Sequence, residues 1–221
     1  MEGDYKYLHM KLKLPPYRFL VVLAAVSIVS SLSFAAVPPD DIVSKLQQKY
    51  ETIGTIEADF VQEAASKAMK RSDTSEGRVY FKKPGRMRWE YKKPLEDLIV
   101  SNGKTIWVYQ PDLAQAIEKP FDAGASGLAT DFLSGIGDLK KNFKAKVADG
   151  NTITLVPKDP GESIRKITLA LDSDGLVRKT TIDDAFGNET SITFKNMKTN
   201  VEIKDSLFEF KPSKGVTIVR P

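Results

Sequence analysis

The sequence contains no cysteine and a single histidine, His9, near its N-terminus. A chain without cysteine forms no disulfide, offers no thiol nucleophile and carries no lipid anchor on a cysteine. Because His9 precedes the predicted mature domain, that domain also lacks a Ser-His-Asp triad and a histidine-ligated zinc site. These absences close most routes to hydrolysis, and we expect no catalytic residue, no metal and no cofactor.

A strong excess of one charge is also missing, since 33 Lys and Arg stand against 29 Asp and Glu. Proteins that bind nucleic acid concentrate positive charge to neutralise phosphates. The sequence therefore predicts no nucleic-acid partner. Brief contact with an anionic membrane surface remains open.

The longest apolar run, "FLVVLAAVSIVSSLSFAA" from Phe19, follows a basic stretch at the start of the chain. It ends in small residues, with Ser33 and Ala35 at positions −3 and −1 of a signal peptidase site. A transmembrane helix is the alternative, but the uninterrupted apolar part is shorter than the roughly 20 residues that a bilayer requires. We predict that residues 1–35 are a cleaved signal peptide and that residues 36–221 form a single domain.

Most of the mature chain alternates apolar and polar residues with the period of a strand. The segments "NTITLV", "KITLALD" and "TSITFK" each place one apolar and one polar face. Between such runs stand Asp149-Gly150, Asp174-Gly175 and Gly187-Asn188, pairs that supply the positive φ of tight hairpins. Roughly ten such strands predict one large antiparallel sheet, which must curl or be covered to keep its apolar face from water.

The run "EAASKAMKRSDTSEG", residues 63–77, interrupts this pattern. It is polar and has no clear alternation of apolar residues. We interpret it as a long mobile connection between two strands of a hairpin.

Two segments have helical patterns. Residues 40–50 predict a helix capped by Asp40, with Ile42, Leu46 and Tyr50 on one face. The segment "SGLATDFLSGIGDLKKNF" predicts short helices broken by glycine, whose apolar stripe includes Leu128, Phe132 and Leu133.

Short helices hinged by glycine can form a movable cover over a sheet. Ordinary packing between helix and sheet is the alternative for any one of their apolar residues. A curled sheet with so few helices to fill it leaves room for the apolar part of a ligand.

The segment "KKPGRMRWEYKKP", residues 82–94, threads aromatic side chains between charged ones. As a strand it places Met87, Trp89 and Tyr91 on one face and charged residues on the other. Pro84-Gly85 predicts a turn before it. Lys83 then lies at the rim, where a cation meets the polar head of a ligand; a solvated lysine is the alternative.

The segments "GRVYFKKPGRMRWEY", "IVSNGKTIWVYQPDLAQA", "LVPKD", "DDAFGNETSITFKN" and "FEFKPSKGVTIV" follow one another in this order. Together they resemble the LolA family, the periplasmic carriers of bacterial outer-membrane lipoproteins. The elements Lys-Pro-x-x-x-x-Trp, Ser-Asn-Gly-Lys-x-x-Trp-x-Tyr and Phe-x-Phe-x-Pro-x-x-Gly-Val are more specific in combination than any one alone. The resemblance covers essentially the whole mature chain.

This resemblance implies a mainly β fold with some α: an unclosed antiparallel β-barrel, or curled sheet, covered by a lid of short helices around a hydrophobic cavity. Its expected cargo is the acyl chains of lipoproteins. Its expected partners are an inner-membrane ABC-type complex that releases lipoproteins and an outer-membrane lipoprotein acceptor. We expect a monomer in the periplasm.

The resemblance and the strand and helix patterns together predict the residues that bind acyl chains: Ile42, Leu46, Phe60, Phe81, Met87, Trp89, Tyr91, Leu128, Phe132 and Leu133. Lys83 matches a family position that bears a functionally important arginine. Lysine keeps the charge but loses the planar fork of donors. We predict that Lys83 is a transfer residue at the rim of the cavity.

Two other functions are alternatives. One is an envelope protein on the same scaffold that senses or accepts lipoproteins; the absence of cysteine speaks against a lipid-anchored acceptor, and the chain leaves no space for a second domain. The other is a hydrolase of the envelope that depends on paired carboxylates. The acidic residues are scattered along polar strand faces and turns, where carboxylates are usually solvated surface charges.

Overall fold

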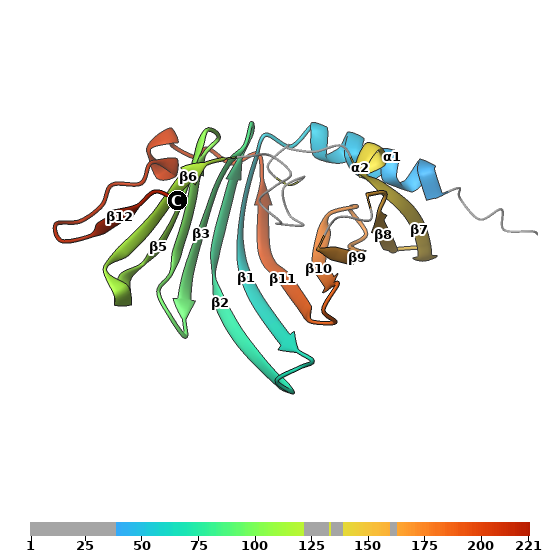
Figure 1. Cartoon of the computed structure of the whole chain (residues 1–221). Coiled ribbons are helices and arrows are strands. Elements are labelled where there is room, and N and C mark those ends of the chain that lie inside the picture. The colour runs from blue at the N-terminus through green and yellow to red at the C-terminus, as the bar shows by residue number, and fades with distance from the viewer. Residues whose placement is uncertain (1–38, 122–132, 134–138, 160–162) are drawn as a thin grey trace, which may run out of the picture. The chain divides into compact units, whose positions relative to one another are not determined.

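Twelve strands form one sheet in the computed structural model (Figure 1). In chain order they are β1 (Thr55–Ser66), β2 (Arg71–Lys82), β3 (Arg86–Lys93), β4 (Leu98–Asn102), β5 (Thr105–Gln110), β6 (Gln115–Pro120), β7 (Phe143–Asp149), β8 (Thr152–Pro157), β9 (Ile164–Leu171), β10 (Val177–Asp184), β11 (Glu189–Thr199) and β12 (Thr217–Val219). The structure describes residues 39–121, 133, 139–159 and 163–221. Contacts divide the chain into units Met1–Ala36 and Val37–Pro221, and all described residues belong to the second unit.

The sheet is open. Its strand order is β12-β6-β5-β4-β3-β2-β1-β11-β10-β9-β8-β7, so β12 and β7 are the two edges. All neighbours pair antiparallel except β12, which pairs parallel with β6. The predicted curled, unclosed sheet is confirmed, with β12 as the exception to its antiparallel order.

The predicted mobile connection over residues 63–77 is wrong. Strands β1 and β2 pair without interruption from Thr55 opposite Lys82 to Ser66 opposite Arg71, which leaves a turn of four residues. The outer half of this hairpin reaches into solvent, so its side chains are polar while backbone hydrogen bonds hold the strands together. The sequence therefore has no apolar alternation there from which the strands could have been predicted.

Few helices accompany the sheet. The predicted first helix is confirmed as α1 (Pro39–Glu51), which begins one residue before Asp40, the predicted cap. Helix α2 (Leu139–Asn142) contacts α1 and β7. The 3-10 helices η1 (Pro111–Leu113) and η3 (Asp205–Phe208) stand in the connections. Among the described residues, no helix is long and apolar enough to cross a membrane.

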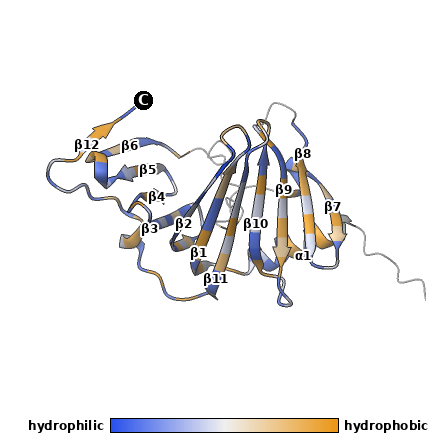
Figure 2. Cartoon of the chain, turned by 90° about the horizontal axis from the view of Figure 1, so that it is seen from below, coloured by the Kyte–Doolittle hydropathy of each residue, from blue (hydrophilic) through white to orange (hydrophobic). Residues whose placement is uncertain are grey.

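Two apolar cores lie on opposite faces of the sheet. We call the face that carries Phe60 and Trp89 the inner face, and the opposite one the outer face. Hydrophobic and hydrophilic residues alternate along the strands, as β8 shows (Figure 2). The smaller core on the outer face contains Val100, Ala116 and Phe208, which are fully buried.

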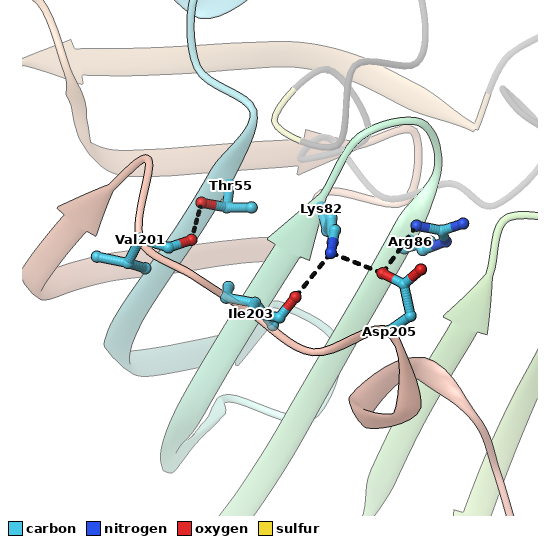
Figure 3. A network of polar contacts seen from close by, with 6 residues as sticks. All are labelled: Thr55, Lys82, Arg86, Val201, Ile203 and Asp205. Carbon is cyan, nitrogen blue, oxygen red and sulfur yellow. Dashed lines mark hydrogen bonds and ion pairs between the residues drawn. The ribbon is translucent and has the colours of Figure 1, made fainter.

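The segment after β11 covers part of the outer face. The ring of Phe210 lies 6.2 Å from that of Trp107 and 5.5 Å from that of Tyr109. Polar contacts fix this segment to β1–β3 (Figure 3). Lys82 Nζ lies 2.6 Å from Asp205 Oδ1 and donates to the carbonyl of Ile203 at 2.7 Å.

The segment after β11 should loosen in acid. The hydrogen bond from Lys82, with the charge of Arg86 adding to it, holds the pKa of Asp205 below its usual value. A carboxyl whose pKa is lowered by folding contributes stability that is complete above its unfolded pKa of about 3.9 and is lost as the pH falls through the folded pKa.

We therefore expect the protection of the Leu207 amide, which donates to the carbonyl of Lys204, to fall as the pH drops below about 4. Hydrogen exchange, corrected for its intrinsic pH dependence, measures this. In Asp205→Asn the fall should be absent, and the same profile in both proteins would refute the assignment.

Candidate functional site

The inner face is built around a cluster of aromatic rings. Trp89 of β3 meets Phe60 of β1 at a centroid distance of 4.9 Å and Phe81 of β2 at 5.7 Å, both edge to face. Phe194 of β11 lies 6.3 Å from Trp89, and Tyr91 lies 5.0 Å from Phe60. These rings come together because each occupies an inward position of its strand and the strands are neighbours in the sheet.

The structure brings most of the predicted lining residues into this one core. Its members include Leu46, Phe60, Phe81, Met87, Trp89 and Leu133, all of them buried. Ile42 and Tyr91 are partly buried and pack against it. Leu128 and Phe132 lie outside the described residues.

The core also contains residues that the predicted site omitted. Those from β8 to β11 are Ile153, Leu155, Ile167, Leu169, Val177 and Ile192, with Phe194 from the aromatic cluster. Apolar alternation marked most of these positions as one face of a sheet. The pattern does not show which strands stand beside Trp89, so their membership in the same site was missed.

Helix α1 lies against this core through Val43, Leu46 and Tyr50. The hydroxyl of Tyr50 accepts a hydrogen bond of 2.9 Å from the backbone N–H of Val177 in β10. Burial raises the pKa of Tyr50 to about 12. The end of the helix is thus tied to the sheet by a neutral phenol.

Lys83 makes a second tie to the end of α1. Its Nζ donates to the backbone carbonyl of Tyr50, and the side chain is half-buried. Burial lowers the pKa of Lys83. A cation at the last carbonyls of a helix is favourable because the helix dipole is negative there. Sequence spacing gave no signal of this contact, which joins residues 33 positions apart.

Among the described residues, two open grooves border the packed core. One, of about 290 Å³, lies beside α1 and β7 and is lined by Val43, Phe143 and Ala145 together with Lys140, Lys144 and Lys158. The other, of about 260 Å³, continues from Tyr91 over Leu95, Ile99 and Val108, with Gln62, Ser75, Pro94 and Asp97 completing its wall. Apolar surface therefore continues from the core toward solvent at both places.

The inner face offers hydrocarbon and aromatic surface and few charges. The buried side chains of this face are mostly apolar, and the polar groups among them include the hydroxyls of Tyr50 and Thr180 and the indole N–H of Trp89. Within the described ranges, no group of three His, Cys, Asp or Glu residues is placed to hold a metal ion. Such a surface binds apolar matter by excluding water from it.

Comparison with known proteins points to one family. The family described as "Outer membrane lipoprotein carrier protein LolA" matches residues 51–211. A protein of Coxiella burnetii named outer-membrane lipoprotein carrier protein is 34% identical over 197 residues, covering 86% of this chain and 92% of the relative. One of the same name from Chromobacterium violaceum is 33% identical over 202 residues, covering 90% and 96%.

The fold also has a counterpart among solved structures. An uncharacterized conserved protein from Thermus thermophilus matches with a TM-score of 0.51 and 16% sequence identity, covering 82% of this chain and 99% of that one. At this identity the match concerns the fold alone.

Proposed function

The chain belongs to the LolA family of outer membrane lipoprotein carrier proteins, and from this we infer that it binds lipoproteins and carries them to the outer membrane. It acts as a carrier and not as an enzyme. One observation supports the role most directly: apolar side chains from α1, β1, β2, β3 and Leu133 meet in a single core on the inner face. Acyl chains are the part of a lipoprotein that such a surface would shield.

The free energy at stake explains why a carrier is needed. Each CH₂ group removed from water contributes about 0.8 kcal/mol. A free acylated protein would therefore not cross an aqueous compartment at a useful rate. A membrane offers nearly the same gain as the inner face, so loading and unloading are close to neutral, and their direction must come from partners.

We propose that acyl chains reach the inner face when α1 moves away from the sheet. The described side chains of the core pack against one another. An acyl chain therefore needs the space that α1 occupies in this arrangement. Lys83 and the N–H of Val177 both hold Tyr50, at the end of that helix. A partner that prefers the open arrangement by a few kcal/mol is sufficient to shift the population.

The proposed route begins with export. Residues 1–35 would direct the chain to the periplasm and be removed, leaving residues 36–221 as the carrier domain. An inner-membrane ABC-type complex would load the cargo, and an outer-membrane acceptor would receive it. Membership of the family supports this route. The loading complex and the acceptor are partners that we propose.

Mass spectrometry of the protein purified from its own periplasm tests the function. We expect acylated peptides or intact lipoproteins to elute with it after gentle purification. A preparation that is free of acylated material under conditions where the cell exports lipoproteins would contradict the carrier role. Intact mass of the same sample reports whether the chain begins at residue 36.

Replacing Lys83 by leucine should weaken the hold on α1 without unfolding the protein. The substitution removes a charged hydrogen bond whose lysine is half-exposed. We therefore expect the stability of the closed form relative to the open form to fall by about 1 kcal/mol. A less stable closed form favours the open, loaded one, and cargo should be retained about fivefold more tightly. Transfer from loaded carrier to acceptor membranes should slow accordingly.

The matched control is Lys104→Leu, which removes an exposed lysine from the turn between β4 and β5. It should transfer cargo at the rate of the unmodified protein. Lys83→Arg should restore most of the transfer rate because arginine can still donate to the carbonyl of Tyr50. Equal transfer by Lys83→Leu and the control would remove Lys83 from the mechanism.

A further inference from the structure

The indole N–H of Trp89 is buried and has no acceptor among the described residues. The side chain is only 2% exposed, so water does not reach it. An indole nitrogen is a donor only, and buried donors are almost always paired in folded proteins. An orphan of this kind on a binding surface indicates a partner that arrives with the ligand.

The three rings that contact Trp89 supply no oxygen. Its ring neighbours are Phe60, Phe81 and Phe194, whose side chains contain carbon and hydrogen alone. Trp107 on the outer face provides the contrast. Its Nε1 donates to Glu118 Oε2 at 3.0 Å, so the chain satisfies one of its two indoles and leaves the other unpaired.

We propose that Trp89 Nε1 donates a hydrogen bond to a carbonyl oxygen of the cargo lipid, at the ester or amide that begins an acyl chain. This inference rests on the proposed carrier function. Every acyl chain has a carbonyl at its head, whereas the rest of the chain has no acceptor. The inner face would therefore recognise acyl groups as such and not hydrocarbon in general.

The hydrogen bond would also fix how far a chain enters. Apolar contacts alone allow a hydrocarbon chain to slide, because each methylene is like the next. A single donor within apolar walls holds one oxygen and thereby sets the register of the chain. Cargo bound in one register presents its protein part at one place.

Two lipopeptides that differ only at the linkage provide the test. One carries two palmitoyl chains as esters, and the other carries two hexadecyl chains as ethers, which lack the carbonyl. Each competes with a fluorescent fatty acid for the full-length mature protein. We expect the unmodified protein to prefer the ester by about three- to tenfold more than Trp89→Phe does.

Comparing the preference between variants cancels the different hydration of esters and ethers. Trp107→Phe is the matched control, because it removes the indole whose N–H is already paired, and it should keep the full preference. The Trp89 indole proton of the unmodified protein gives a second readout that needs no variant. Its NMR signal should move downfield with the ester lipid and not with the ether.

An equal preference in the unmodified protein and in Trp89→Phe, with no movement of the indole signal, would overturn the inference. Both lipids would then still bind, and the carrier function would stand. If neither lipid bound to any variant, the proposed function itself would fail, and the inference would fall with it.

Discussion

A Phe60→Ala variant is expected to lose about 3–5 kcal/mol of unfolding free energy. The Phe60 side chain is 1% exposed and makes edge contacts with the rings of Trp89 and Tyr91. Its removal deletes a large apolar contact and leaves a cavity that the stiff surrounding strands cannot close. Urea denaturation should show the loss as a lower midpoint with an unchanged slope.

The control for this variant is Phe186→Ala, whose side chain is 80% exposed. It should change the stability by less than about 0.5 kcal/mol. If the cavity lies where acyl chains bind, a fatty acid should also restore part of the lost stability of Phe60→Ala. Equal stability of the two variants would show that the inner face is not the core of this fold.

Replacing Gly77 by alanine should cost about 3 kcal/mol, at the upper end for an overpacked site. A Cβ at this position would lie 2.0 Å from the carbonyl oxygen of Glu90 and 2.9 Å from Cε1 of Phe60. The oxygen belongs to the backbone of the paired strand β3 and cannot turn aside. The strand must therefore shift at the place where it carries Trp89.

Gly150→Ala serves as the control because nothing lies within 4 Å of the position that its Cβ would take. Thermal unfolding of both variants compares them directly. The Gly77 variant should melt several degrees below the control, since about 1 kcal/mol corresponds to roughly 2–4 °C in a domain of this size. Matching midpoints would mean that β2 and β3 separate more easily than their spacing suggests.

The sequence predicted those parts of the fold that depend on neighbouring residues. Alternation placed Met87, Trp89 and Tyr91 on one face of β3, and the structure confirms this. The same local signal gave the strands of the second half and the first helix. A sheet with one apolar face then followed from the need to keep that face from water.

Contacts between distant segments could not be predicted in this way. The outer half of the β1–β2 hairpin is held by backbone hydrogen bonds, which leave no pattern in the side chains. Strand β12 has three residues and pairs with a segment about a hundred positions earlier, too short a run for alternation to reveal. The contacts of Asp205 with Lys82 and Arg86 likewise join residues that only the folded sheet brings together.

The site was predicted in part for the same reason. Periodicity and the family resemblance together selected residues of α1 and β1–β3 that meet in the core. Neither source showed that Lys83 holds the carbonyl of Tyr50, because this contact depends on where the helix ends above the sheet. The unpaired indole of Trp89 is likewise a property of its surroundings and not of the sequence.

The most direct test of the central claim locates the acyl chains on the protein. A lipopeptide with ¹³C-labelled acyl chains, bound to unlabelled protein, permits isotope-filtered NOE measurements between chain and protein. We predict NOEs from the chains to the rings of Phe60, Trp89 and Phe194 on the inner face. NOEs to Trp107 and Phe210 on the outer face, with none to the inner rings, would contradict it.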